Sequence, residues 1–132
     1  MARATGLGGF FFKAQDPKQL QAWYCQHLGL KAEDYGGVNF LWRDDDAPEK
    51  RGMTVWSPFP ADTKYFEPGQ KPFMMNFRVD DLDGLLAKLR AAGVTVEDKV
   101  DKYDYGRFGW IMDPEGNRIE LWEPPVGTAG RS

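Results

Sequence analysis

The sequence predicts an α+β protein made of two tandem βαβββ modules. Three observations lead to this fold class. Short segments rich in aromatic and β-branched residues alternate with two segments of helical spacing, the pattern of the first half returns in the second, and a proline-rich stretch separates the halves. The length of 132 residues suits a single domain, and the 42% of hydrophobic residues are enough for a core.

The first half begins with a strand and a helix. Residues 7–14 read LGGFFFKA, which is typical of a strand. Asp16 is a suitable N-cap for the helix that follows, and Gly29 is placed to end it. Two more strands are expected at residues 37–44 and 52–59, with a charged loop between them.

The second half repeats this order after a connection at about residues 58–72, which contains four prolines. A strand at 73–79 precedes a helix within 80–94, where the leucines share one face and Gly93 is the stop. Three more strands are expected, at residues 94–100, 107–113 and 117–123.

Equivalent positions in the two halves carry similar residues. The pattern Phe-basic-x-x-Asp that starts at Phe12 returns at Phe77, an offset of 65 (77 − 12). Any two strand–helix units look somewhat alike, but the joint agreement of aromatic, basic, acidic and glycine positions favours a duplication. The expected boundaries within one domain, 1–132, are about 7–57 for module 1, 58–72 for the linker, 73–124 for module 2 and 125–132 for a flexible tail.

Composition limits the kinds of partner and the compartment. The net charge is −3, and the basic residues are scattered, which argues against a nucleic-acid-binding protein. No window approaches the ~20 apolar residues of a membrane helix. The single cysteine, Cys25, excludes an intrachain disulfide. We therefore expect a cytoplasmic protein that binds neither nucleic acid nor a membrane.

The segment DPEGN, residues 113–117, predicts a three-residue hairpin loop in which Asp113 pairs with Asn117. Strand alternation then divides the flanking side chains between two faces. One face mixes aromatic and charged residues, as ligand cavities do: Phe108, Trp110, Met112, Arg118, Glu120 and Trp122. The other face is apolar and is expected to pack against a helix: Ile111, Ile119 and Leu121.

The doubled pattern, and above all the closing segment DPEGNRIELWEPP at residues 113–125, resembles the vicinal oxygen chelate superfamily. This superfamily includes glyoxalase I, bleomycin-resistance proteins and extradiol dioxygenases, and the resemblance covers about residues 7–124. It implies that the two modules form a cupped mixed sheet around a central cavity, with the helices outside. It also implies a homodimer.

The resemblance further implies where a divalent metal would bind. The family's enzymes take ligands from the first strand of each module, commonly His, and from a glutamate on the last strand. These positions fall on Gly9, Met74 and Glu120. Gly and Met do not hold such cations, and the only histidine, His27, lies in the first predicted helix. We therefore expect no cofactor; a divalent metal held by an unusual, oxygen-rich set of ligands is the alternative.

The candidate site residues lie on strands around the predicted cavity. Apolar contact is expected from Phe11, Trp56, Met74, Phe108 and Trp110, and polar contact from Lys13, Asn76, Arg78, Arg118 and Glu120. Lys13 and Arg78 either receive an anionic ligand group or are solvated strand ends. Glu120 is either a catalytic base or a carboxylate satisfied by Arg118 and Trp110. Residues 101–110 form either a mobile aromatic lip over the cavity or a strand with a bulge.

Three functions agree with these features. The leading hypothesis is the binding of a small, partly aromatic molecule in the cavity without a catalytic metal. The alternative is an enzyme, a lactoylglutathione-lyase-like lyase, an isomerase or a dioxygenase, that uses Glu120 as base or metal ligand. A third hypothesis is a module that binds a partner protein through its sheet edges.

Overall fold

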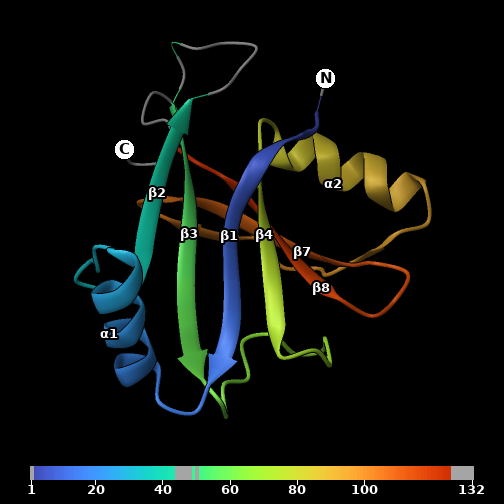
Figure 1. The fold of residues 1–132 in the computed structure, drawn as a ribbon. Coiled ribbons are helices and arrows are strands. Elements are labelled where there is room, and N and C mark those ends of the chain that lie inside the picture. Colours follow the sequence, from blue (N-terminus) through green and yellow to red (C-terminus); the bar gives the residue numbers. More distant parts are fainter. Residues whose placement is uncertain (1, 44–48, 50, 126–132) are drawn as a thin grey trace.

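A computed structural model describes residues 2–43, 49 and 51–125 of the chain, which form one eight-stranded mixed sheet and two helices (Figure 1). The first half contains β1 (Ala4–Ala14), α1 (Pro17–Leu28), β2 (Val38–Arg43) and β3 (Arg51–Pro60). The second half contains β4 (Phe73–Val79), α2 (Leu82–Ala91), β5 (Thr95–Val96), β6 (Asp101–Tyr103), β7 (Gly106–Met112) and β8 (Arg118–Glu123). The tail expected at 125–132 lies, after Pro125, outside the described residues.

The strand order β2-β3-β1-β4-β8-β7-β5 has an internal symmetry, with β6 paired to β7. In the first half β1 pairs with β3 in parallel and β2 pairs with β3 antiparallel. The second half repeats this arrangement, because β4 pairs with β8 in parallel and β7 pairs with β8 antiparallel. The antiparallel pair of β1 and β4 joins the halves at the centre (Figure 1). This pairing agrees with the duplication that the sequence indicates.

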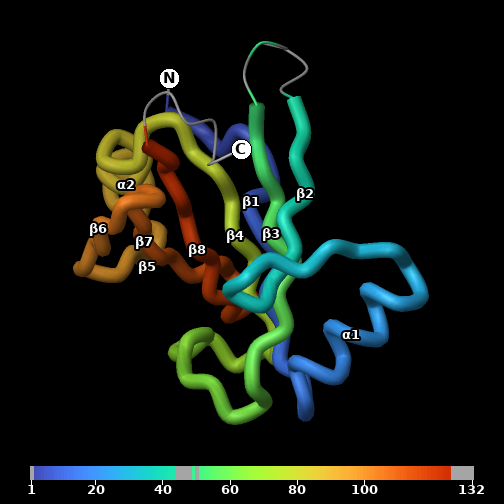
Figure 2. Tube along the Cα trace, turned by 90° about the vertical axis from the view of Figure 1, so that its left-hand side faces the viewer, coloured from blue at the N-terminus to red at the C-terminus, as the bar shows by residue number. Residues whose placement is uncertain are grey.

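The open sheet and the outer helices confirm the predicted α+β class, with differences in strand number. Two strands follow α1 in the described part of the first half. Four follow α2, because only Thr95–Val96 of the stretch expected as a strand at 94–100 forms one, β5, and a further short strand, β6, comes after that stretch. In Figure 2 β5–β8 lie on the far side of β4 from β1–β3, and α1 lies on the outer side of β1 and β3.

Both helices begin and end as their sequences indicate. The Asp16 carboxylate accepts a hydrogen bond from the Gln19 backbone N–H at 3.1 Å, and Gly29 ends α1 with φ of +72°. Asp81 caps α2 in the same way through the Gly84 N–H. The helices differ in burial, because α1 has no buried residue, whereas α2 buries three leucines.

Two hydrophobic clusters lie on opposite faces of the sheet. Between the sheet and α2 the buried residues are Val79, Leu82, Leu85, Leu86 and Leu121, and Ile111 and Ile119 pack against them. The concave face holds the other cluster: Met53, Phe66, Met74, Phe108, Trp110 and Trp122. The expected division of the β7–β8 hairpin into a helix-facing and a mixed face is therefore confirmed.

The hairpin turn has the predicted geometry. The Asp113 N–H donates to the Asn117 carbonyl at 3.0 Å, and Gly116 has φ of +83°. The Asp113 carboxylate accepts from the backbone N–H groups of Glu115 and Asn117, and it also accepts from the Asn117 amide. These hydrogen bonds lower the pKa of Asp113. The register that follows pairs Met112 with Arg118, Trp110 with Glu120, and Phe108 with Trp122, as predicted.

The connection between the halves starts after Pro60, where β3 ends, and it has no regular helix or strand. Figure 2 shows it on the opposite side of the central strands from α1. Its Phe66 is buried in the concave cluster, so this segment is part of the core and not only a linker. Within the described ranges neither helix is long and apolar enough to cross a membrane.

Candidate functional site

The concave face of the sheet encloses a cavity of about 650 Å³. The first half contributes side chains from β1 and β3: Phe11, Met53, Val55, Ser57 and Phe59. The second half contributes Tyr103, Tyr105, Phe108 and Trp122 from the β6–β7 hairpin and β8. Both predicted modules therefore line one space, as the resemblance implies.

Trp56 was expected in this cavity, but it lies on the other face of the sheet. Its ring contacts Phe12 and Tyr24, with ring centroids 5.4 and 4.8 Å away, and Tyr24 belongs to α1. The reason is the parallel register that pairs Trp56 with Phe10. Because Phe11 faces the cavity, Phe10 and its partner on β3 must face outward.

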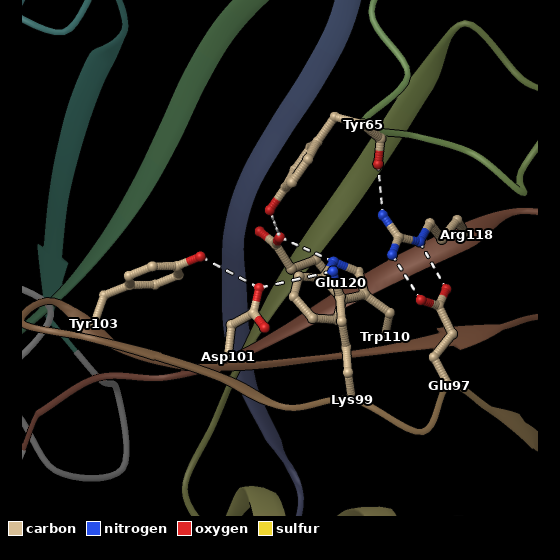
Figure 3. A network of polar contacts seen from close by, with 8 residues as sticks. All are labelled: Tyr65, Glu97, Lys99, Asp101, Tyr103, Trp110, Arg118 and Glu120. Carbon is tan, nitrogen blue, oxygen red and sulfur yellow. Dashed lines mark hydrogen bonds and ion pairs between the residues drawn. The ribbon is translucent and has the colours of Figure 1, made fainter.

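Glu120 is the polar centre of the cavity and is only 2% exposed. Its Oε1 accepts from Asn76 Nδ2 at 2.6 Å. Its Oε2 accepts from Trp110 Nε1 at 3.0 Å and from the Tyr65 hydroxyl (Figure 3). Burial raises the pKa of Glu120, and the three donors oppose that shift. The sheet places two of the donors, since Asn76 on β4 and Trp110 on β7 both face Glu120 on β8.

Asn76 presents an unsatisfied acceptor. Its Oδ1 is buried and has no hydrogen-bond partner among the described residues. This oxygen lies above Gly8, where a Cβ atom would be 2.1 Å away, so a side chain at position 8 would displace the amide. Gly8 lies at a register shift between Leu7 and Gly9, a β-bulge that brings its backbone to the cavity wall.

Arg118 contacts Tyr65 and Trp110, which bind Glu120, but it makes no hydrogen bond or ion pair with Glu120 itself. Its guanidinium makes two hydrogen bonds of 2.7 Å to the Glu97 carboxylate and a third to the Tyr65 carbonyl (Figure 3). It also lies 4.9 Å from the Trp110 ring centroid. Trp110 itself is buried in the core behind Glu120 and does not line the cavity. Of the two partners expected for Glu120, therefore, only Trp110 contacts it.

Arg78 lies beyond the end of the cavity between two indoles. Its guanidinium carbon is 5.5 Å from the ring centroid of Trp42 and 5.4 Å from that of Trp122. Trp42 reaches it by lying over Gly6 and Gly52, where a Cβ atom would be 2.5 and 2.3 Å from the ring. Arg78 Nε and Nη1 are buried without hydrogen-bond partners among the described residues, and burial lowers the pKa of this side chain.

Lys13 and Met74 also lie outside the cavity wall. Lys13 is on the same face of β1 as Phe11 but borders a separate surface hollow with residues 67–70. Met74 is fully buried in the concave cluster. The structure therefore does not place Lys13 and Arg78 at the cavity, which was one of the two positions considered for them. Of the ten predicted site residues, four line the cavity: Phe11, Asn76, Phe108 and Glu120.

The aromatic segment after residue 100 forms two paired strands, and its tyrosines line the cavity. Tyr103 ends β6 and Tyr105 lies in the turn to β7, so the segment is a strand hairpin, and both rings also line the cavity. They stack with centroids 5.2 Å apart and are about half exposed. The Trp122 indole N–H holds the turn through the Tyr105 carbonyl at 2.8 Å.

The residues around Glu120 do not fit a divalent metal. The β4 residue that faces Glu120 is Asn76, and Met74, which the family spacing suggested, lies two residues away in the core. The described residues contain no group of three or more His, Cys, Asp or Glu side chains that could hold an ion. A single carboxylate that already accepts three hydrogen bonds and one amide oxygen are too few ligands for Zn, Ni, Mn or Mg.

Tyr65 and Tyr35 line the cavity but were not predicted to do so. Tyr65 belongs to the proline-rich connection, where no periodicity indicates which side chains turn inward. Tyr35 lies in the loop before β2, and burial together with the nearby Glu33 raises its pKa to about 12. Val55 and Ser57 lie on the opposite face of β3 from Trp56. Had the sequence shown that Trp56 faces outward, strand alternation would have predicted that these two residues line the cavity.

Comparisons with known proteins agree with this architecture. The model of the glyoxalase-like domain family matches residues 9–122. An uncharacterized protein of Escherichia coli K12, YaeR, is 31% identical over 121 residues, which cover 83% of this chain and 89% of YaeR. The crystal structure of methylmalonyl-CoA epimerase from Mycobacterium tuberculosis superposes with a TM-score of 0.59 at 22% identity, over 96% of this chain and 92% of the epimerase.

A second structural likeness is to a glyoxalase/bleomycin resistance protein/dioxygenase superfamily member from Vibrio splendidus 12B01, with a TM-score of 0.56 and 13% identity. It covers 93% of this chain and 99% of that protein. At such identities the structural likenesses establish the fold alone. The family match shows that this chain belongs to the glyoxalase-like domain family, in agreement with the resemblance that its sequence carries.

Proposed function

We propose that this protein binds a small, partly aromatic molecule in its cavity without the help of a metal. The supporting observation is the lining of the cavity, where eight of the fifteen residues are aromatic. Its volume of about 650 Å³ is in the usual range for small-molecule sites. Burial of a flat apolar ligand among these rings supplies the affinity, and the few polar groups orient it.

A second candidate function is catalysis with Glu120 as a general base. The observation that favours it is a buried carboxyl group at the cavity wall whose pKa is raised by burial. Such a group accepts a proton from a bound substrate more readily than an exposed glutamate does. The reaction would then be that of a lyase, an isomerase or a dioxygenase.

The binding proposal is tested by thermal unfolding of the purified protein with a panel of small aromatic compounds. A bound compound raises the melting temperature, because it binds only the folded state. Phe11→Ala removes a cavity ring and is expected to reduce the shift, whereas Phe40→Ala, which truncates an exposed ring on β2, is the matched control and keeps it. Absence of a shift for every compound contradicts the proposal.

Glu120→Gln separates binding from catalysis. This change keeps the shape of the side chain and removes its ability to take a proton. A binding protein is expected to retain its affinity for neutral ligands within about threefold, whereas an enzyme loses turnover of the compound that it converts. Turnover should be followed directly, by chromatography of each stabilising compound after incubation with the wild-type protein.

A further inference from the structure

We infer that the cavity selects aromatic molecules that carry a cationic, hydrogen-bond-donating group, bound at an acceptor site formed by Asn76 Oδ1 and Glu120 Oε1. This inference rests on the proposed binding function and specifies the chemistry of the ligand. It follows from three features of the described residues: the orientation of one amide, the free capacity of one carboxylate oxygen, and the distribution of charge around the cavity.

The orientation of the Asn76 amide follows from its partner. An ionised carboxylate can only accept hydrogen bonds, so Asn76 must turn Nδ2 toward Glu120 Oε1, at 2.6 Å. Its Oδ1 then points the other way, over Gly8, where it is buried without a partner. A buried amide oxygen without a donor is costly. Both Asn76 and Gly8 line the cavity, so an N–H group of a ligand can satisfy this acceptor.

Glu120 has capacity for the same ligand group. Its Oε2 already accepts two hydrogen bonds, from Tyr65 and Trp110, but Oε1 accepts only the one from Asn76. A carboxylate oxygen can accept two. Two acceptors, Oε1 and Asn76 Oδ1, are therefore available on facing residues of the adjacent strands β8 and β4. Amidinium and guanidinium ions carry several N–H donors and can therefore donate to more than one acceptor.

The charge around the cavity favours a cation. Among the residues that line it, Glu120 is the only one with a charged side chain. The nearby Arg118 makes paired hydrogen bonds to Glu97, and Lys99 lies 3.9 Å from Asp101, so each of these cations has an acidic partner of its own. The charge of Arg118 also acts on Glu120, where it lowers the pKa and so favours the ionised carboxylate. The aromatic lining adds to this preference, because ring faces attract cations. A ligand carboxylate would instead face an acidic group across an apolar space.

Arg78 is the alternative site for a charged ligand group, and it would favour an anion. Its Nε and Nη1 are buried without hydrogen-bond partners among the described residues. These atoms lie between the indoles of Trp42 and Trp122, and Arg78 is not part of the cavity wall. An anion could reach them only if an indole moved. Asn76 and Glu120, in contrast, belong to the cavity wall, and the hydrogen-bonding capacity that they leave unused is that of acceptors.

The test uses three probes of nearly equal size and different charge: benzamidine, benzamide and benzoate. Calorimetric titration of the wild-type protein at neutral pH is expected to show benzamidine binding about tenfold or more tightly than benzoate, with benzamide between them. Glu120→Gln is expected to remove this preference. Arg78→Met, which leaves the acceptor pair intact, is expected to keep it. The comparison of probes on the wild-type protein does not depend on the folding of any variant.

The outcomes distinguish this inference from the proposed function. Tighter binding of benzoate, lost in Arg78→Met, would overturn the inference and place the polar site at Arg78. Equal binding of the three probes would also overturn it, while the cavity remained a binding site for aromatic molecules. If neither these probes nor the wider aromatic panel bound, the proposed function would fail, and the inference with it.

Discussion

Trp110 donates its indole N–H to Glu120 at 3.0 Å across the β7–β8 pair. The two residues face each other because Asp113 and Asn117 close the hairpin three residues beyond Trp110. Trp110 is buried in the core, so its indole is held in place by packing and presents a fixed donor to the carboxylate. A local turn therefore determines which donor meets the buried acid.

The stability of the protein is expected to fall as the pH rises above 4.5, the ordinary pKa of a glutamate. Burial raises the pKa of Glu120 in the folded state, so the folded protein holds a proton there more tightly than the unfolded chain. The contribution of Glu120 is thus complete below 4.5 and is lost as the pH rises through the higher folded pKa. Chemical unfolding of the wild type and of Glu120→Gln across this range should give a difference that changes with pH. A constant difference would show that the pKa of Glu120 is not raised.

Gly8→Ala is expected to disturb the Asn76–Glu120 pair. The new Cβ would lie 2.1 Å from Asn76 Oδ1, and the displaced amide costs about 1–3 kcal/mol, as overpacking usually does. Binding of the aromatic probes should weaken together with the loss of stability. Gly116→Ala is the matched control, because its positive φ makes the substitution cost about 1–2 kcal/mol in a turn far from the cavity. Equal binding by both variants would show that Asn76 is not needed for it.

Glu97→Gln is expected to destabilise the protein by about 2–3 kcal/mol, since it leaves the Arg118 guanidinium, which is 7% exposed, without its counter-charge. Asp83→Asn is the control. It breaks an ion pair with Arg107 of the same length, 2.7 Å, but Asp83 is exposed and the effect should be small. Urea unfolding monitored by tryptophan fluorescence measures both. Similar losses of stability for the two variants would show that the Arg118–Glu97 pair stabilises the fold no more than an exposed ion pair does.

Two substitutions of Arg78 separate packing from charge. Arg78→Met keeps an unbranched side chain between Trp42 and Trp122 and removes a buried cation, so stability should stay within about 1 kcal/mol of the wild type. Arg78→Ala leaves a gap between the indoles and should cost about 2–4 kcal/mol. A loss for Arg78→Met as large as that for Arg78→Ala would show that the cation, through its contacts with the rings, stabilises the fold.

The homodimer implied by the family resemblance stays a prediction and can be measured directly. Helix α1 buries no residue, and Trp23 and Leu28 on it are 52% and 63% exposed, as in many protein interfaces. Sedimentation equilibrium should give twice the chain mass of 15.0 kDa. If this helix is in the interface, Leu28→Lys should lower the mass toward the monomer. A monomeric wild-type protein would exclude the dimer.

The features that local chemistry decides were predicted from the sequence. The Asp16 cap locates the first helix, the leucine spacing and Gly93 locate the second, and the turn at Asp113 determines the register that brings Trp110 opposite Glu120. Each depends on residues only a few positions apart, so the interactions form in any fold that keeps the segment. The duplication was visible for the same reason, because each half carries its own local signals.

Other features required the tertiary structure. Alternation along β3 divides its residues between two faces, but only the parallel register with β1 shows that Trp56 faces outward. Likewise, Arg118 pairs with Glu97, and Tyr65 meets Glu120 only because the irregular connection folds back over the sheet.

The sequence by itself therefore determined the fold class, the hairpin and the position of the buried acid Glu120. The tertiary structure decided what surrounds that acid: an amide oxygen of Asn76 without a partner, a ring of aromatic side chains, and no second charged side chain among the residues that line the cavity. The physical reason is that turns and caps are set by neighbours in the chain, whereas the composition of a cavity depends on which distant strands and loops pack together.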